Sequence, residues 1–130
     1  MNRLFTSCVL AAGFAVPLLA HHSPASMYDV SRTVTIEGTV GGVEWLNPHA
    51  QFILNVNDAA GKVVSWKVEL PPPNALIQRG WKKADLKTGD HVSVVVWIAK
   101  DGSPAADIRF LTLPDGRVLS GQSIWDRAIQ

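Results

Sequence analysis

Three histidines stand at positions in the sequence where their ring nitrogens could bind a metal ion. His21 and His22 directly follow an apolar run that ends at Ala20, and His49 lies in the tripeptide Asn-Pro-His. If the chain is cut after Ala20, His21 carries a free α-amine that can chelate a metal together with its own ring. Cu(II) favours nitrogen ligands most strongly among the divalent metals. The sequence therefore predicts a copper site formed by His21, His22 and His49.

Each of these histidines also has a plainer interpretation. The pair at 21–22 could be a solvated tail, and His49 could be a turn residue whose ring bonds to nearby backbone, since Asn-Pro is typical of turns. His91 follows Gly89-Asp90 at the start of a predicted strand and is expected to be an ordinary surface residue. Met27 and Tyr28 are expected to pack the N-terminal segment onto the rest of the protein.

The first 20 residues are typical of a signal peptide. Arg3 is followed by an uncharged, mostly apolar run through Ala20, and no positively charged stop-transfer cluster follows. The run is slightly short for a membrane span. We therefore expect export to the periplasm, with no stable membrane anchor after processing. Cleavage after Ala15 or Ala25 is the alternative; the first leaves the histidines internal and the second deletes His21 and His22.

Composition excludes several classes of function. Without Arg3 the chain has 11 Lys and Arg against 11 Asp and Glu, so the basic footprint of a nucleic-acid-binding protein is absent. The single cysteine, Cys8, lies within the predicted signal peptide. The mature protein would therefore have neither a disulfide nor a cysteine metal site. Core packing must hold it together, and five tryptophans supply much of the apolar area.

Alternating apolar and polar residues predict five strands. They lie at residues 32–45, 50–57, 62–70, 91–99 and 105–113. In the first strand the apolar phase slips at Gly41-Gly42, which predicts a bulge or a sharp bend. Pro73 suits the first position of a short helix that ends at Gly80. A short additional hairpin follows the last strand at residues 113–119.

The predicted order is three strands, a short helix and two strands. This is the element order of the five-stranded oligonucleotide/oligosaccharide-binding (OB) barrel, with the helix between strands 3 and 4. The bend at Gly41-Gly42 favours this mainly β barrel over a small open sandwich, because it lets one strand serve both halves of a curled sheet. The predicted organisation is a signal peptide at 1–20, an irregular segment at 21–31, the barrel at 32–120 and a tail at 121–130.

Catalytic motifs are absent from the sequence. No serine stands in a G-x-S-x-G context, and there is neither a P-loop nor a dinucleotide fingerprint. The carboxylates are scattered over strand faces and turns, and no spacing singles out an acid and base pair. The sequence therefore favours a protein that is not an enzyme.

Several motifs resemble those of a known family. The segments HHS, VEWLNPH, PNALIQRGW and LKTGDHVSVV are similar, in order over nearly all of residues 21–120, to a family of small exported bacterial proteins. The family is catalogued as a domain of unknown function, number six-one-five-two. The resemblance implies an exported single domain of OB-barrel type whose signal peptide ends directly before HHS. It implies no activity, and His91 does not match the family's pattern.

The leading hypothesis is an exported, non-enzymatic barrel that binds copper through His21, His22 and His49. It would act as a periplasmic carrier or accessory protein, with an exported redox enzyme or another periplasmic protein as partner. The alternative is a periplasmic binding module without metal, whose barrel face near Trp45 and Trp81 recognises a small molecule, a glycan or a protein. An oxidative enzyme that uses an N-terminal copper is a third, weaker hypothesis.

Overall fold

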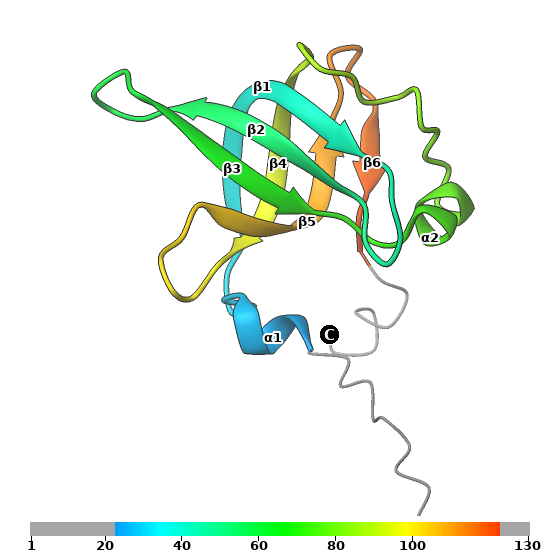
Figure 1. Ribbon diagram of the computed structural model, residues 1–130, viewed down its shortest axis with the longest axis horizontal. Helices are drawn as coiled ribbons and strands as arrows, with labels where there is room; N and C mark the ends of the chain where they lie inside the picture. Colours follow the sequence, from blue (N-terminus) through cyan, green and yellow to red (C-terminus); the bar gives the residue numbers. More distant parts are fainter. Residues whose placement is uncertain (1–22, 123–130) are drawn as a thin grey trace, which may run out of the picture.

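The computed structural model describes residues 23–122, which form six strands and two short helices (Figure 1). In chain order these are α1 (Pro24–Met27), β1 (Val34–Glu44), β2 (Gln51–Asn57), β3 (Val63–Glu69), α2 (Pro73–Gln78), β4 (His91–Ile98), β5 (Ala105–Thr112) and β6 (Val118–Ser120). Neither helix in this part of the chain has the length and apolar character needed to cross a bilayer.

The first five strands close into a barrel. Antiparallel pairing gives the order β3-β2-β1-β4-β5, and a parallel pairing of β3 with β5 joins the two ends. This closure spans three residue pairs, from Lys67 opposite Ala105 to Glu69 opposite Asp107. The short α2 lies between β3 and β4 in the chain. The predicted OB-like barrel with one helix between strands 3 and 4 is therefore confirmed.

The two halves of β1 pair with different neighbours, which is what bends the sheet into a barrel. Residues 34–39 pair with β4 and residues 39–44 pair with β2. The register with β2 shifts between Val40 and Gly42, so the bulge predicted at Gly41-Gly42 is confirmed. A third glycine near this bend was not predicted to matter: a Cβ on Gly38 would overlap the backbone oxygen of Asn55.

The apolar side chains that alternate along each strand point into the barrel. Phe52, Leu54, Val68 and Val94 are each at most 1 % exposed. Trp81 is buried within the core cluster, and its indole N–H donates to the carbonyl of Ser120 over 2.8 Å. That hydrogen bond gives the indole nitrogen a partner inside an otherwise apolar environment.

Two elements extend the predicted scheme. The short strand β6 adds an antiparallel hairpin to the outer edge of β5, as the sequence suggested for residues 113–119. The segment expected to be irregular begins instead with one helical turn, α1, in which Pro24 occupies the first turn. Proline is tolerated there because the amide that it lacks would have no partner within the helix.

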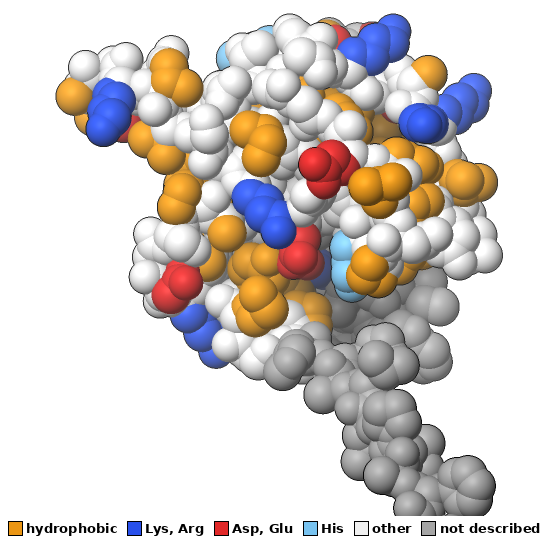
Figure 2. Space-filling model, viewed as in Figure 1, with side chains coloured by type: hydrophobic (Ala, Val, Ile, Leu, Met, Phe, Trp, Pro, Cys, Tyr) orange, Lys and Arg blue, Asp and Glu red, His pale blue; other side chains and the backbone are white. Residues whose placement is uncertain are grey.

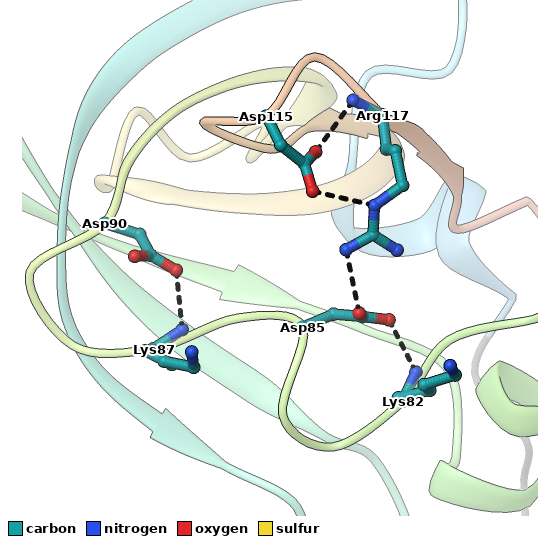
Figure 3. A network of polar contacts seen from close by, with 6 residues as sticks. All are labelled: Lys82, Asp85, Lys87, Asp90, Asp115 and Arg117. Atoms are coloured by element: carbon teal, nitrogen blue, oxygen red, sulfur yellow. Dashed lines mark hydrogen bonds and ion pairs between the residues drawn. The ribbon is translucent and has the colours of Figure 1, made fainter.

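An ion-pair network fastens the loop between α2 and β4 to the turn before β6 (Figure 3). The guanidinium of Arg117 contacts Asp115 over 2.8 Å and Asp85 over 3.1 Å. Burial opposes ionisation of Asp85, but hydrogen bonds from the Lys82 amide and from Arg117 outweigh it and hold the pKa of this carboxyl below its usual value. The network braces one side of the barrel away from the N-terminal segment.

The close approach at Gly38 makes a prediction about stability. Gly38→Ala should lower the free energy of unfolding by about 1–3 kcal/mol, because the added methyl group overlaps backbone that cannot rotate away. Gly42→Ala is the matched control in the same strand, since nothing lies within 4 Å of its added Cβ. Urea denaturation of both variants measures the difference. Equal stabilities would show that β1 and β2 separate easily at this point.

Candidate metal centre

A row of polar side chains crosses the outside of the barrel near one end. The inward neighbours of these positions on β2, β3 and β5 are buried, so the alternation of each strand turns the row outward. Cross-strand pairing places the members in line. They are Glu44, Gln51, Glu69 and Asp107, and the aromatic Trp97 ends the row. In Figure 2 acidic side chains and a histidine are visible on the face toward the viewer. This end of the barrel is therefore polar and rich in carboxylates.

His49 lies at this end, in the loop that connects β1 to β2. The backbone there continues the β2–β3 ladder, because the amide of Leu70 donates to the carbonyl of Ala50 over 2.9 Å and the amide of Ala50 donates to Pro71 over 3.3 Å. The Asn47–Pro48 peptide bond directly before His49 is cis. These contacts hold the loop against the end of β3.

The ring of His49 is oriented by one hydrogen bond. Its Nδ1 lies 3.2 Å from the backbone oxygen of Leu70. A carbonyl oxygen can only accept, so Nδ1 must carry the proton and donate it. The lone pair is then on Nε2, and the side chain is exposed to solvent. Metal-binding histidines commonly have this arrangement, in which the distal N–H is bonded to a carbonyl and the other nitrogen is free to coordinate.

The N-terminal segment reaches the same end of β3 through Tyr28. This side chain is only 5 % exposed, and its hydroxyl donates to Oε2 of Glu69 over 2.6 Å. The backbone alongside is tied to β4, because the amide of Asp29 donates to the carbonyl of Ile98 over 2.9 Å. The prediction that Tyr28 packs the segment onto the barrel is confirmed. Met27 remains more than half exposed and does not contribute in the same way.

The surroundings of Tyr28 strongly disfavour its phenolate. Burial is the largest cause, followed by the hydrogen bond to Glu69 and by the negative charges of Glu69, Asp107 and Asp101. Together they raise the pKa of the phenol far above its ordinary value. The guanidinium of Arg109, 3.8 Å from the Asp107 carboxylate, partly offsets the negative charge there.

Two of the residues singled out from the sequence, Tyr28 and His49, contact neighbouring residues at the end of β3. Tyr28 contacts the side chain of Glu69, and His49 contacts the carbonyl of Leu70. His21 and His22 lie outside the described residues. His91 is exposed and starts β4, whereas the N-terminal segment contacts the opposite end of that strand. His91 therefore belongs to the other end of the barrel.

Between residues 23 and 122 no group of three or more His, Cys, Asp or Glu side chains is arranged to hold a metal ion. A centre at His49 would therefore need ligands from outside this range.

Sequence reasoning missed the role of Glu69. Glu69 alternates with apolar residues on β3, so it was expected to point into solvent. Nothing in the neighbouring sequence indicated that a tyrosine 41 residues earlier would contact it. The stacking of Arg109 on Trp97, with 3.6 Å from the guanidinium carbon to the ring centroid, was also not predicted. The first contact joins the N-terminal segment to β3, and the second joins the neighbouring strands β4 and β5.

The two tryptophans considered for ligand stacking are not equivalent. Trp81 is 2 % exposed and is hydrogen-bonded inside the core, so it offers no surface to a ligand. Trp45 is partly buried and packs against the same core. A ligand face built from both rings is therefore excluded, and only Trp45 remains for such a role.

Tyr28 is the only tyrosine in the chain, so the ultraviolet absorbance of phenolate reports on this residue alone. We expect no ionisation near the ordinary pKa of about 10 in the folded protein. Because the folded state binds this proton more tightly than the unfolded state, the contribution to stability is complete below about pH 10 and declines as the pH rises further. Glu69→Gln should lower the pKa of the phenol. Ionisation at the ordinary value in the folded wild type would contradict the buried hydrogen bond.

Comparison with known proteins gives a family but no activity. The family model described as "Family of unknown function (DUF6152)" matches residues 9–107. Comparisons with curated proteins and with solved structures find no match. The match covers well over half of the chain, including the histidines and four of the five barrel strands. The chain therefore belongs to this family of unknown function.

Proposed function

We propose that this protein is an exported, non-enzymatic β-barrel that binds one copper ion. His21 would chelate the ion through its α-amine and its ring, after cleavage of a signal peptide behind Ala20. His22 and His49 would complete the set of nitrogen ligands. The protein would act in the periplasm as a carrier or accessory protein that presents copper to an exported redox enzyme or to another periplasmic protein.

The hydrogen bond between His49 and Leu70 is the observation that carries this proposal. It fixes the tautomer in which Nε2 keeps its lone pair, and it holds the ring on an exposed loop at a defined place. A surface histidine without such a bond would change both its tautomer and its orientation freely. Orientation by a backbone carbonyl is the outer-shell feature that metal-binding histidines share.

The chain between His22 and Tyr28 is long enough for the proposed site. Residues 24–27 form the single turn of α1, and the remaining links can be extended, so the segment spans roughly 13–20 Å. Tyr28 and His49 contact adjacent residues of one strand end, whose Cα atoms are about 3.8 Å apart. The closeness of these two contact points supports a site that the N-terminal nitrogens and the His49 ring share.

The ligand chemistry favours copper over other metals. A set of amine and imidazole nitrogens without thiolate suits Cu(II), which stands at the top of the divalent affinity order. Calcium is disfavoured, because no loop clusters the Asp and Asn oxygens that it requires.

Titration of the exported protein with Cu(II), in competition with a chelator of known affinity, tests the proposal. His21→Ala and His49→Ala should each weaken binding by about tenfold or more, since removing an outer-shell partner alone costs roughly 10–100-fold in metal affinity. His91→Ala is the matched control: it removes an exposed imidazole from the opposite end of the barrel and should leave binding unchanged.

Three outcomes would count against the proposal. An intact mass that begins after residue 22 would remove the N-terminal ligands. Wild-type affinity in His49→Ala would exclude this residue from the site. Absence of Cu(II) binding by the wild type would end the metal hypothesis and leave the binding module without metal as the better account.

A further inference from the structure

The hairpin formed by β2 and β3 projects beyond the barrel (Figure 1). Pairing of β2 with β1 reaches no further than Asn55, whereas pairing of β2 with β3 continues to Asn57. On its other side β3 pairs with β5 only over residues 67–69. Within residues 23–122, therefore, no strand pairs with the outer side of Val63–Trp66. These four residues are the free edge of β3.

The backbone groups along the free edge point to its open side. In an antiparallel pair, the N–H and C=O groups of successive residues point alternately toward the partner strand and away from it. The amide of Lys67 points away from β2, because it donates to the carbonyl of Pro104 over 2.9 Å. Val63 and Ser65 therefore direct their N–H and C=O groups to the same side, and both residues are exposed. Such a row is a template for pairing with another strand.

The free edge lacks the features that usually keep edge strands apart, which are charged side chains, prolines and bulges. It reads Val-Val-Ser-Trp, and its register with β2 is continuous. Val63 is 56 % exposed, and Val64 and Trp66 are only partly buried. Hydrophobic side chains are visible along the projecting hairpin in Figure 2. A strand added here would cover apolar surface as well as bind the open backbone groups.

The backbone of the free edge fits a second copy of itself in one register. Antiparallel pairing uses every open group of the edge when Val63 of each copy faces Ser65 of the other, which forms four backbone hydrogen bonds. Val64 then lies opposite Val64 of the second copy. The pairing cannot slide further along β3, because the amide of Lys67 is already bonded to Pro104.

The side chains match in the same register. Val64 pairs with Val56 of β2, so the valines of both copies would form one row across the contact. Lys62 would lie opposite Trp66 of the second copy, where an ammonium group and an aromatic ring attract each other. Lys67 would face Gly61, so no two like charges meet. The free edge is therefore complementary to itself in hydrogen bonding, apolar contact and charge.

We infer that two copies of this protein associate through the free edges of β3, forming a continuous antiparallel sheet in the order β2-β3-β3-β2. The contact is isologous, as in most homodimers. The free edge supplies far fewer than the roughly 20–30 residues a side of a stable interface, so the dimer is weak and reversible. The inference needs no metal and no residue outside the range 23–122, and it is independent of the proposed function.

Sedimentation and hydrogen exchange of the metal-free protein test the dimer, with a chelator present so that histidines cannot bridge two copies. Between about 10 μM and 1 mM protein the dimer fraction should rise. The amides of Val63 and Ser65 should exchange more slowly as it rises, while that of Val64, which points toward β2, stays constant. A monomer at every concentration, or a dimer without this alternation, overturns the inference.

A charge exchange at Val64 tests the register. Val64→Lys and Val64→Glu each place two like charges opposite one another, so each alone should weaken self-association about tenfold or more. An equimolar mixture should associate again, because opposite charges then face each other. Val118→Lys and Val118→Glu are the matched controls, since Val118 is an exposed valine on β6. They should associate as the wild type does, alone and mixed.

A proline variant checks the hydrogen bonds without adding charge. Val63→Pro removes an N–H that points to the open side, and proline is tolerated at the first residue of an edge strand. It should weaken association while the near-ultraviolet circular dichroism stays that of the folded wild type. Wild-type association in Val63→Pro and Val64→Lys would place the contact on another surface. A mixture of the two Val64 variants that stays monomeric would show that the pairing is not centred on Val64.

Discussion

The parallel pairing of β3 with β5 is the constraint on which the rest of the structure depends. It involves only three residue pairs, yet it converts a curled sheet into a closed barrel. The inward residues of the middle pair, Val68 and Ala106, are completely buried. Closure lets a chain without cysteine in residues 23–122 bury a continuous apolar core, so that packing stabilises this part of the chain without a disulfide.

The same pairing creates the polar end of the barrel. Because the strand alternation turns Glu69 and Asp107 outward at the point of closure, carboxylates from distant parts of the chain become neighbours. Tyr28 covers one of them, and its phenol stays protonated because burial and nearby negative charge both oppose ionisation. The β1–β2 loop is attached to the residue that follows Glu69. The N-terminal segment and His49 therefore both contact the end of β3.

The barrel and the N-terminal segment are stabilised in different ways. The barrel has a continuous apolar interior that includes Trp81, whereas the segment has one buried side chain and a few hydrogen bonds. Local stability follows the amount of buried apolar contact. The segment should therefore open more readily than the strands.

The sequence by itself determined the elements and their order. Alternation in β3 identified Val64, Trp66 and Val68 as one face, the slip at Gly41-Gly42 identified the bulge, and Pro73 with Gly80 delimited α2. These features are local, so nearby residues suffice to predict them. The tertiary structure alone decided that Gly38 contacts Asn55, that Tyr28 meets Glu69 and that the His49 ring donates to Leu70. An outward position on a strand says that a side chain leaves the core, but what it meets there depends on which strands and loops lie beside it, and alternation along one strand does not give that.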